Sequence, residues 1–338
     1  MIQEAASGRA KEWTIVIPAL NEEKCIGRCL DAIAKLSTSA QSFEVLLVDN
    51  GSVDKTISIA QSYTSRLNLR VLQAPGLGIG ALRNLGVSQS TGEFLAFVDA
   101  DCLAPPAWLN SAAALLRNYR DAVIGSQYAL PEDAGWPARV WRRRFHDGRS
   151  GDVAYVPAGN LLISRELFRS LGGFNAKLKS NEDGEFCSRA LASGYRVLAF
   201  PELAATHLGA EKNLRHFMRR QMWHGANVCN GAAFTGNVRA LSLATYTLAC
   251  AICLLLAICL PGSVAWYLPL AALLLAPAFL CLGGLRRCGR DLPRLFLLLF
   301  TYSVVRACVL PLAALRGVRE CVTDRSRQPA EVGNTCRT

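Results

Sequence analysis

The sequence predicts an α/β fold with a mostly parallel sheet flanked by helices, followed by C-terminal transmembrane helices. Three observations lead to this prediction. Short β-branched or aliphatic runs alternate with segments of helical periodicity up to about residue 235, as in βαβ units. Several of these runs end in acidic residues. The rest of the chain contains three long apolar segments, at residues 241–260, 264–283 and 292–315.

The predicted elements alternate along the chain. Strands are expected over residues 13–17, 43–48, 69–72 and 94–98. Helices are expected over residues 24–36, 55–65 and 81–89. The fourth run, Phe94-Leu-Ala-Phe-Val98, is apolar throughout, which indicates a strand buried on both faces of a parallel sheet.

Polar side chains follow three of these strands. Asn21 and Glu22 follow the first, Asp49 ends the second, and Asp99 and Asp101 follow the fourth. The carboxyl ends of parallel strands meet at one edge, where open α/β sheets bind ligands. Two carboxylates there suit Mg²⁺ or Mn²⁺ holding a diphosphate. The alternative, that every one of these residues makes a turn or caps a helix, is the less economical explanation.

A glycine-rich turn follows the third strand. Gly76-Leu-Gly78-Ile-Gly80-Ala81 fits a G-x-G-x-x-A dinucleotide fingerprint, with Asp99 about twenty residues further on. That pattern would suggest an oxidoreductase. However, the turn does not follow the first strand, and Asp99 belongs to an Asp-x-Asp pair. We therefore favour a flexible turn that lets the backbone approach a nucleotide.

The net charge of +11 is concentrated in arginine clusters interleaved with tryptophan, at residues 136–146 and 215–223. Such clusters suit lipid headgroups, and phosphate-bearing substrates are another use for them. Nucleic acid is disfavoured as a partner, because a membrane-tethered chain has a nearer anionic surface. The 13 cysteines are odd in number and scattered, so metal or redox sites built from them are not expected.

The apolar segments predict a multi-pass protein of the cytoplasmic membrane. Segments 241–260 and 264–283 contain no charged residue and are expected to form a hairpin. Segment 292–315 contains Arg306, so it either crosses the membrane, re-enters it or lies along the interface. The polar tail, residues 1–12, lacks the apolar region of a signal peptide, so we expect the large domain in the cytoplasm.

Taken in order, the motifs of residues 15–225 resemble those of the family 2 glycosyltransferases, which have the nucleotide-binding GT-A fold. The matching elements are Ile17-Pro18-Ala19-x-Asn21-Glu22, Val48-Asp49-Asn50-Gly51-Ser52-x-Asp54-x-Thr56, Gly80-Ala81-x-Arg83-Asn84-x-Gly86, Asp99-x-Asp101, Ala158-Gly159-Asn160, Gly172-Gly173-Phe174, Glu182-Asp183-x-Glu185-Phe186-x-x-Arg189 and His207. The resemblance implies a GT-A catalytic domain over residues 13–235. A membrane domain over 236–318 and a basic tail over 319–338 would follow.

The resemblance also implies roles for single residues. Those expected to bind the nucleotide-sugar, a UDP- or GDP-sugar, are Pro18, Ala19, Glu22, Asp49, Arg83 and Asp99. Asp101 and His207 would hold Mg²⁺ or Mn²⁺. Asp183 matches the general base, which implies an inverting reaction. Glu182 or Glu185 could take that role instead, or pair with Arg189. Candidate acceptor-binding residues are Gly172, Gly173, Glu182, Arg219, Arg220 and Trp223.

One motif departs from the family. Processive polysaccharide synthases carry Gln-x-x-Arg-Trp, whereas this chain reads Arg219-Arg220-Gln221-Met222-Trp223, without arginine directly before tryptophan. This departure favours transfer of one sugar, and the apolar segments suggest a lipid or lipid-linked acceptor. Two alternatives stay open: a polyprenyl-phosphate sugar transferase, and a non-catalytic membrane scaffold that retains the fold. The intact Asp99, Asp101, Asp183 and His207 argue against the scaffold.

Overall fold

The computed structural model describes residues 11–38, 42–145, 148, 150–178, 180–227, 259, 281, 288–305 and 309. The chain divides into two compact units, Met1–Lys212 and Asn213–Thr338. The catalytic domain was predicted to extend to residue 235, whereas the first unit ends at Lys212.

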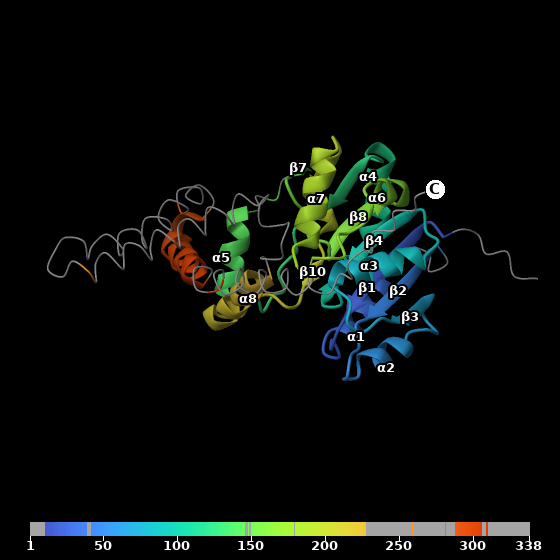
Figure 1. The fold of residues 1–338 in the computed structure, drawn as a ribbon, viewed down its shortest axis with the longest axis horizontal. Helices are drawn as coiled ribbons and strands as arrows, with labels where there is room; N and C mark the ends of the chain where they lie inside the picture. The colour runs from blue at the N-terminus through green and yellow to red at the C-terminus, as the bar shows by residue number, and fades with distance from the viewer. Residues whose placement is uncertain are drawn as a thin grey trace, which may run out of the picture. The chain divides into compact units, whose positions relative to one another are not determined.

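An eight-stranded sheet forms the centre of the first unit (Figure 1). Its strands are β1 (Trp13–Ala19), β2 (Phe43–Asp49), β3 (Leu69–Gln73), β4 (Phe94–Val98), β6 (Ala122–Gly125), β7 (Gly151–Asp152), β8 (Asn160–Ser164) and β9 (Arg196–Ala199). They are ordered β3-β2-β1-β4-β8-β6-β9-β7. β1 pairs in parallel with β2 and β4, β2 with β3, and β6 with β9. β8 is antiparallel to both neighbours, and β7 to β9. The prediction of a mostly parallel sheet is confirmed.

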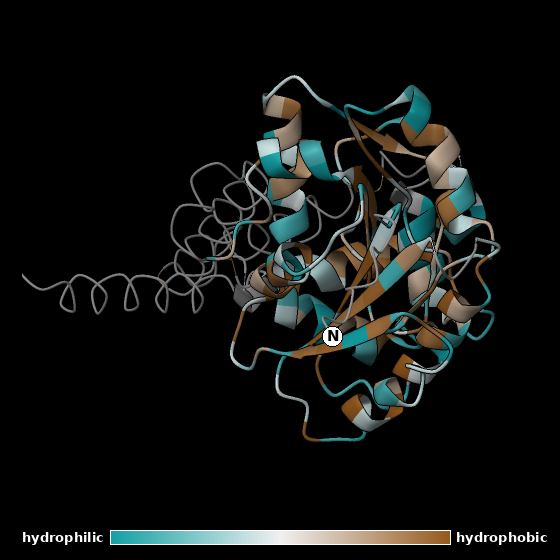
Figure 2. Ribbon diagram, turned by 90° about the vertical axis from the view of Figure 1, so that its right-hand side faces the viewer, coloured by the Kyte–Doolittle hydropathy of each residue, from teal (hydrophilic) through white to brown (hydrophobic). Residues whose placement is uncertain are grey.

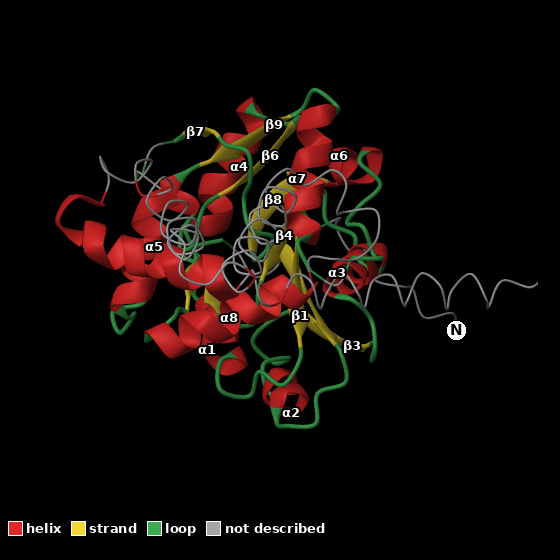
Figure 3. Cartoon of the chain, turned by 60° about the vertical axis from the view of Figure 1, so that its left-hand side comes forward, coloured by secondary structure: helices red, strands yellow, loops and turns green. Residues whose placement is uncertain are grey.

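Helices cover both faces of the sheet (Figure 3). One core contains buried residues of α1 (Ile26–Ala34), α2 (Thr56–Gln61) and α4 (Trp108–Asn118). The other contains residues of α3 (Ile79–Ser88), α6 (Arg165–Ser170) and α7 (Glu182–Ala192). Hydrophobic residues are concentrated along the strands between these layers, and hydrophilic ones are frequent on the helices (Figure 2).

The predicted double burial of the fourth strand is confirmed. Every residue of β4 is buried. Ala96 and Val98 belong to the core on one face, whereas Leu95 and Phe97 belong to the core on the other. This alternation follows from the two-residue period of a strand. Because β4 lies beside β1 in the middle of the sheet, its carboxyl end delivers Asp99 and Asp101 to the centre of the edge.

Two of the three predicted helices are shorter in the structure, whereas the third, predicted over residues 81–89, begins earlier, at Ile79. The periodic segment 24–36 forms α1 only from Ile26, and 55–65 forms α2 only from Thr56 to Gln61. Residues Ile26, Cys29, Leu30 and Ile33 recur at helical spacing and make the buried face of α1. Periodicity therefore located each helix, whereas the residues that end it depend on local turns.

The second unit contains α8 (Leu214–Asn227), a 3₁₀ turn (Gly289–Asp291) and a helix over residues 292–305. The prediction of a multi-pass membrane protein needs correction here. Within the described part of the chain, no helix combines the length and apolar character that crossing a membrane requires. Apart from residues 259 and 281, segments 241–260 and 264–283 lie outside the described residues, as do 306–308 and 310–315 of the third segment.

Candidate active site at the carboxyl edge of the sheet

Asp101, the second acid after β4, lies beside His207. Oδ2 of the carboxylate is 3.3 Å from Nε2 of the imidazole. With the thiol of Cys102, these side chains place three ligand atoms within 4.8 Å of one another. Carboxylates suit Mg²⁺ and Mn²⁺, and imidazole is a common ligand of transition ions. The pair therefore fits the predicted divalent ion, and fits Mn²⁺ better than Mg²⁺.

A short ribbon of β5 (Cys102–Leu103) and β10 (Thr206–His207) brings the histidine to this position. The strands pair antiparallel, with His207 opposite Cys102. The backbone N–H of Leu208 donates to the carbonyl of Asp101 at 2.9 Å. A Cβ at Gly209 would lie 2.6 Å from Oδ2 of Asp101, so a side chain at this position would have to displace the carboxylate.

Asp99, the first acid, is held by the protein itself. Oδ1 accepts a hydrogen bond from Nη2 of Arg83 at 2.8 Å, and Oδ2 accepts one from the Tyr128 hydroxyl at 2.9 Å. The Tyr128 ring also packs against His207, with ring centroids 4.8 Å apart. Tyr128 and His207 therefore connect Asp99 with Asp101. Both carboxylate oxygens of Asp99 accept hydrogen bonds from the protein, whereas the carboxylate of Asp101 lies beside His207.

Arg83 joins the Asp-x-Asp motif to the acidic start of α7. Its guanidinium is buried, and it donates to both Asp99 and Glu182. Burial alone would lower the pKa of Arg83, but the charges of Asp99 and Glu182 outweigh it and raise that pKa. The predicted contact between Arg83 and the nucleotide stays a prediction, because both of these bonds go to protein carboxylates.

Of the three acids in the first turn of α7, two pair with arginine. Glu182 binds Arg83, and Glu185 binds Arg189 at 2.8 and 2.7 Å. The pairing of Glu185 with Arg189 is one of the alternatives that the sequence left open. In the described part of the chain, Asp183 is the acid of this turn that has no arginine partner.

Asp183 instead receives neutral donors. Its Oδ2 accepts hydrogen bonds from the Tyr155 hydroxyl at 2.9 Å and from the backbone N–H of Ala158 at 3.2 Å. Its Oδ1 accepts one from the N–H of Gly184 at 2.8 Å. The carboxylate is thus fixed in orientation by neutral donors, with no arginine bonded to it among the described residues.

The predicted nucleotide-binding residues lie at the ends of β1 and β2. Ala19 ends β1 and is directly opposite Asp49, which ends β2. Asp49 is buried, and its Oδ2 accepts hydrogen bonds from the N–H groups of Gly51 and Ser52, both at 2.9 Å. Its Oδ1 is buried without a partner among the described residues. A buried acceptor of this kind is costly unless a ligand donates to it.

Glu22 lies in the turn after β1, close to the acids of the Asp-x-Asp motif. Burial, followed by the charges of Asp101, Asp99 and Asp54, raises the pKa of Glu22 to about 7. A carboxyl group with such a pKa marks a concentration of negative charge that a bound cation would relieve.

The candidate acceptor residues are spread over both units. Gly172 and Gly173 have positive φ values of 75° and 70°, and the carbonyl of Gly173 accepts from Arg189 at 2.9 Å, so this turn packs against α7. The remaining candidates lie on α8 of the second unit, and acceptor binding there stays a prediction: Arg219, Arg220 and Trp223.

Sequence reasoning missed Tyr128 and Tyr155, and it assigned no role to Gly209. Each of the two tyrosines bonds a site carboxylate from a loop more than twenty-five residues away in the sequence, at separations of 29 and 28. No local pattern signals such a contact. Gly159 belongs to one of the family motifs, and the structure shows why glycine is found there: a Cβ would lie 2.0 Å from Oδ2 of Asp99.

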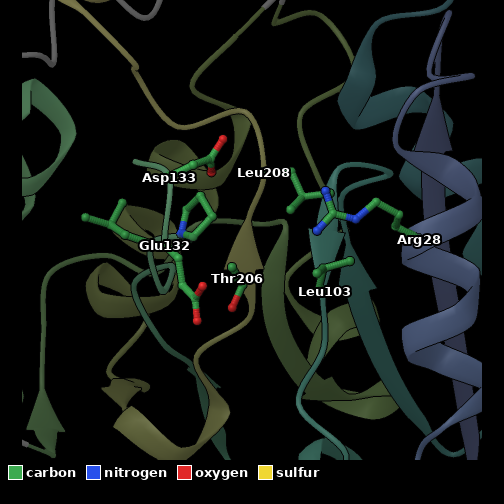
Figure 4. Close-up of a pocket in the computed structure, with 8 residues that line it drawn as sticks. Arg28, Leu103, Glu132, Asp133, Thr206 and Leu208 are labelled. Carbon is green, nitrogen blue, oxygen red and sulfur yellow. The ribbon is translucent and has the colours of Figure 1, made fainter. Parts of the chain in front are cut away.

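A cavity of about 460 Å³ lies on the other face of the β5–β10 ribbon (Figure 4). Leu103 and Thr206 are paired across the ribbon and line the cavity, whereas His207 and Cys102 point to the opposite face, because side chains alternate along a strand. Arg28 extends into it toward Leu208, with Glu132 and Asp133 on the far side (Figure 4). None of the residues predicted from the sequence lines this cavity.

Two family models match the chain. Residues 14–172 match the model described as Glycosyl transferase family 2, and residues 94–285 match the one described as Glycosyl transferase family group 2. Together they include the edge of the sheet where Asp49, Asp99, Asp101, Asp183 and His207 lie.

Curated relatives are similar over the same region. The glycosyltransferase AglE of Haloferax volcanii is 28% identical over 200 residues, covering 57% of this chain and 66% of that protein. The poly(ribitol-phosphate) beta-N-acetylglucosaminyltransferase TarS of Staphylococcus aureus is 27% identical, covering 57% and 35%. The pre-mycofactocin glycosyltransferase of Mycobacterium tuberculosis is 26% identical, covering 64% and 47%. The chain thus spans less than two thirds of the length of these relatives.

Solved structures share the fold. The mannosyltransferase PcManGT of Pyrobaculum calidifontis, in complex with GDP-Man and Mn²⁺, matches with a TM-score of 0.59 and 19% identity, covering 91% of this chain and 87% of that one. Residues 1–349 of S. aureus TarS in complex with UDP match with a TM-score of 0.52 and 19% identity, covering 96% and 94%. The expected GT-A fold is confirmed.

Proposed function

This chain belongs to glycosyl transferase family 2, and on that premise we propose that it moves one sugar from a nucleotide-sugar to an acceptor hydroxyl with inversion at the anomeric carbon. Such a reaction needs charge neutralisation on the departing nucleoside diphosphate and deprotonation of the attacking hydroxyl. The two tasks fall to different acids of the site.

The observation that carries the proposal is the pairing of these acids. Glu182 and Glu185 each bind an arginine, whereas Asp183 receives only neutral donors. A neighbouring positive charge stabilises the ionised form of a carboxylate and weakens it as a base. Of the three, Asp183 is therefore the carboxylate that no arginine holds, so it is the one that can meet an acceptor hydroxyl as a general base.

Asp101 and His207 are the residues that would hold a divalent ion. When bound, the ion would neutralise charge on the diphosphate leaving group. Asp99, held by Arg83 and Tyr128, would fix the start of the ribbon on which these two ligands depend.

The donor's nucleoside would lie along the ends of β1 and β2. The unpartnered Oδ1 of Asp49 supports this placement, because it is a buried acceptor for which no described protein group supplies a donor, and a ligand could supply one. Pro18, Ala19 and Glu22 belong to the same edge and would complete the nucleoside and ribose site.

We further propose a lipid or lipid-linked acceptor. The uncharged sequences 241–260 and 264–283 support an apolar acceptor, and the departure from Gln-x-x-Arg-Trp supports transfer of a single sugar. A polyprenyl phosphate is the alternative acceptor, since the arginines of α8 suit a phosphate as well.

The test is nucleoside diphosphate release by the full chain with Mn²⁺, a panel of UDP- and GDP-sugars, and acceptors with and without a lipid phosphate. The proposal predicts release with one donor class, faster when a lipid-linked hydroxyl acceptor is present. The Asp101→Asn protein should lose release, whereas Asp152→Asn, an exposed acid paired with Arg196, should keep it. A folded protein that binds no nucleotide-sugar would be a scaffold, and the proposal would fail.

A further inference from the structure

The geometry points to Tyr155 as a positioning residue for the Asp183 carboxylate, one that leaves Oδ1 as the oxygen that takes the acceptor's proton. This inference rests on the proposed function, in which Asp183 is the general base. It adds a residue from a different part of the chain and assigns separate tasks to the two carboxylate oxygens.

A count of lone pairs leads to this assignment. The two oxygens of an ionised carboxylate offer about four acceptor positions, two on each oxygen. Oδ2 of Asp183 uses both, for the Tyr155 hydroxyl at 2.9 Å and the Ala158 N–H at 3.2 Å. Oδ1 uses one, for the Gly184 N–H at 2.8 Å. The remaining position on Oδ1 is the one that an acceptor hydroxyl can approach.

The loop that carries Tyr155 is anchored on both sides. It connects β7 to β8, and its neighbours Val156 and Ala158 are buried in the core that contains α7. The N–H of Val153 donates to the carbonyl of Val197 at 2.9 Å, which ties the start of the loop to β9. Tyr155 itself is 37% exposed, so its ring borders the solvent from which an acceptor arrives. A donor on a fixed loop holds its partner without reorganisation during the reaction.

The chemistry of the donor matters as much as its position. Burial, followed by the charge of Asp183, raises the pKa of Tyr155 well above its usual value, so the phenol keeps its proton and donates. An arginine in the same place would also orient the carboxylate but would strongly reduce its proton affinity. A tyrosine hydroxyl orients it at a smaller cost in basicity, which suits a residue that must accept a proton.

A graded series of side chains at position 155 tests the inference through the pH dependence of kcat. Tyr155→Phe removes one hydrogen bond to the ionised carboxylate, so the acidic limb of the profile should move up by about one pH unit, with kcat about tenfold lower at pH values on that limb. Donor KM should stay within about twofold, because the nucleotide contacts lie elsewhere. With 3-fluorotyrosine at this position, the more acidic phenol bonds more strongly, and the limb should move down.

Tyr195 supplies the matched control. It packs against the same core and is partly buried, and it makes no hydrogen bond to a site acid among the described residues. Phe or 3-fluorotyrosine at position 195 should leave the pH profile and kcat unchanged. The protein with 3-fluorotyrosine at position 155 keeps the shape of the tyrosine side chain. Its pH profile therefore tests the role of Tyr155 even if the phenylalanine variant fails to fold.

The Asp183→Asn variant distinguishes failure of the positioning role of Tyr155 from failure of the proposed base, Asp183. If that variant loses transfer while both Tyr155 substitutions leave the pH profile of kcat unmoved, the positioning role of Tyr155 is overturned and the proposed function stands. If Asp183→Asn retains transfer in a folded protein, the proposed base is wrong, and the assignment to Tyr155 falls with it.

Discussion

Arg83 and Glu182 form a buried ion pair although 99 residues separate them in the sequence. The same guanidinium binds Asp99, so one side chain connects the acid that follows β4 with the acidic start of α7. In the proposed reaction these two regions act on opposite sides of the anomeric carbon, one on the departing diphosphate and one on the attacking hydroxyl. Arg83 therefore sets the distance between the two halves of the site.

Loss of Arg83 should destabilise the protein strongly. Arg83→Met leaves two carboxylates without their partner, one of them buried, and should lower the free energy of unfolding by about 3–5 kcal/mol. Arg66→Met, at an exposed pair with Asp31, should change it by less than about 1 kcal/mol. Urea denaturation of both variants measures this difference. Equal losses of unfolding free energy would mean that the buried pair stabilises the protein no more than the exposed one.

The close approach of Gly159 to Asp99 should make any side chain at position 159 destabilising. A Cβ at position 159 would lie 2.0 Å from Oδ2 of Asp99 and 2.3 Å from the Tyr128 hydroxyl. Gly159→Ala should therefore cost about 1–3 kcal/mol of stability and weaken donor binding. Gly27→Ala is the control, because its Cβ meets its nearest neighbour at 3.6 Å in a helix, where alanine is favoured. Calorimetric titration with the donor measures its affinity for the variant. Normal donor affinity in a folded Gly159→Ala protein would contradict the prediction.

The raised pKa of Glu22 gives a pH dependence with a definite sign. Its folded-state pKa is about 7, above the ordinary value of 4.5, so its stabilising contribution is complete below 4.5 and is lost as the pH rises through about 7. Between these pH values, the metal-free protein should lose thermal stability relative to Glu22→Gln. Added Mn²⁺ should reverse this loss and release a proton, since a cation favours the ionised carboxyl. Melting curves at several pH values, with and without Mn²⁺, measure both effects, and parallel curves for the two proteins would contradict the prediction.

His207 should be needed for the divalent ion. His207→Ala removes one of the two proposed ligands and should weaken Mn²⁺ binding, measured by titration with a nucleoside diphosphate present, by at least about tenfold. His216→Ala, on α8, should leave the affinity unchanged. Equal Mn²⁺ affinity in the two variants would remove His207 from the metal site.

The framework of the site was predictable because it depends on local sequence patterns. Continuous apolar runs located β1, β2 and β4, and their ends placed Asp49, Asp99 and Asp101 on one edge of the sheet. The histidine was predictable only from the order of family motifs, because the β5–β10 pairing that brings it to Asp101 joins strands about a hundred residues apart.

The remaining features depend on tertiary contacts that no periodicity encodes. Tyr155 reaches Asp183 from a loop whose path is set by the burial of its neighbours, and Arg83 is buried because two distant carboxylates converge on it. For the apolar C-terminal segments, the sequence pattern led to a wrong prediction. They predicted membrane crossings by their composition, and within the described residues no helix meets the requirement for one.

Sugar transfer by the Asp183→Asn protein is the most direct test of the central claim, that Asp183 is the general base. The substitution keeps the size of the side chain and removes its ability to take a proton. We expect kcat to fall by about 10²–10⁴-fold, while donor affinity and the melting temperature stay close to those of the unmodified protein. Transfer at a near-normal rate by the folded variant would contradict it.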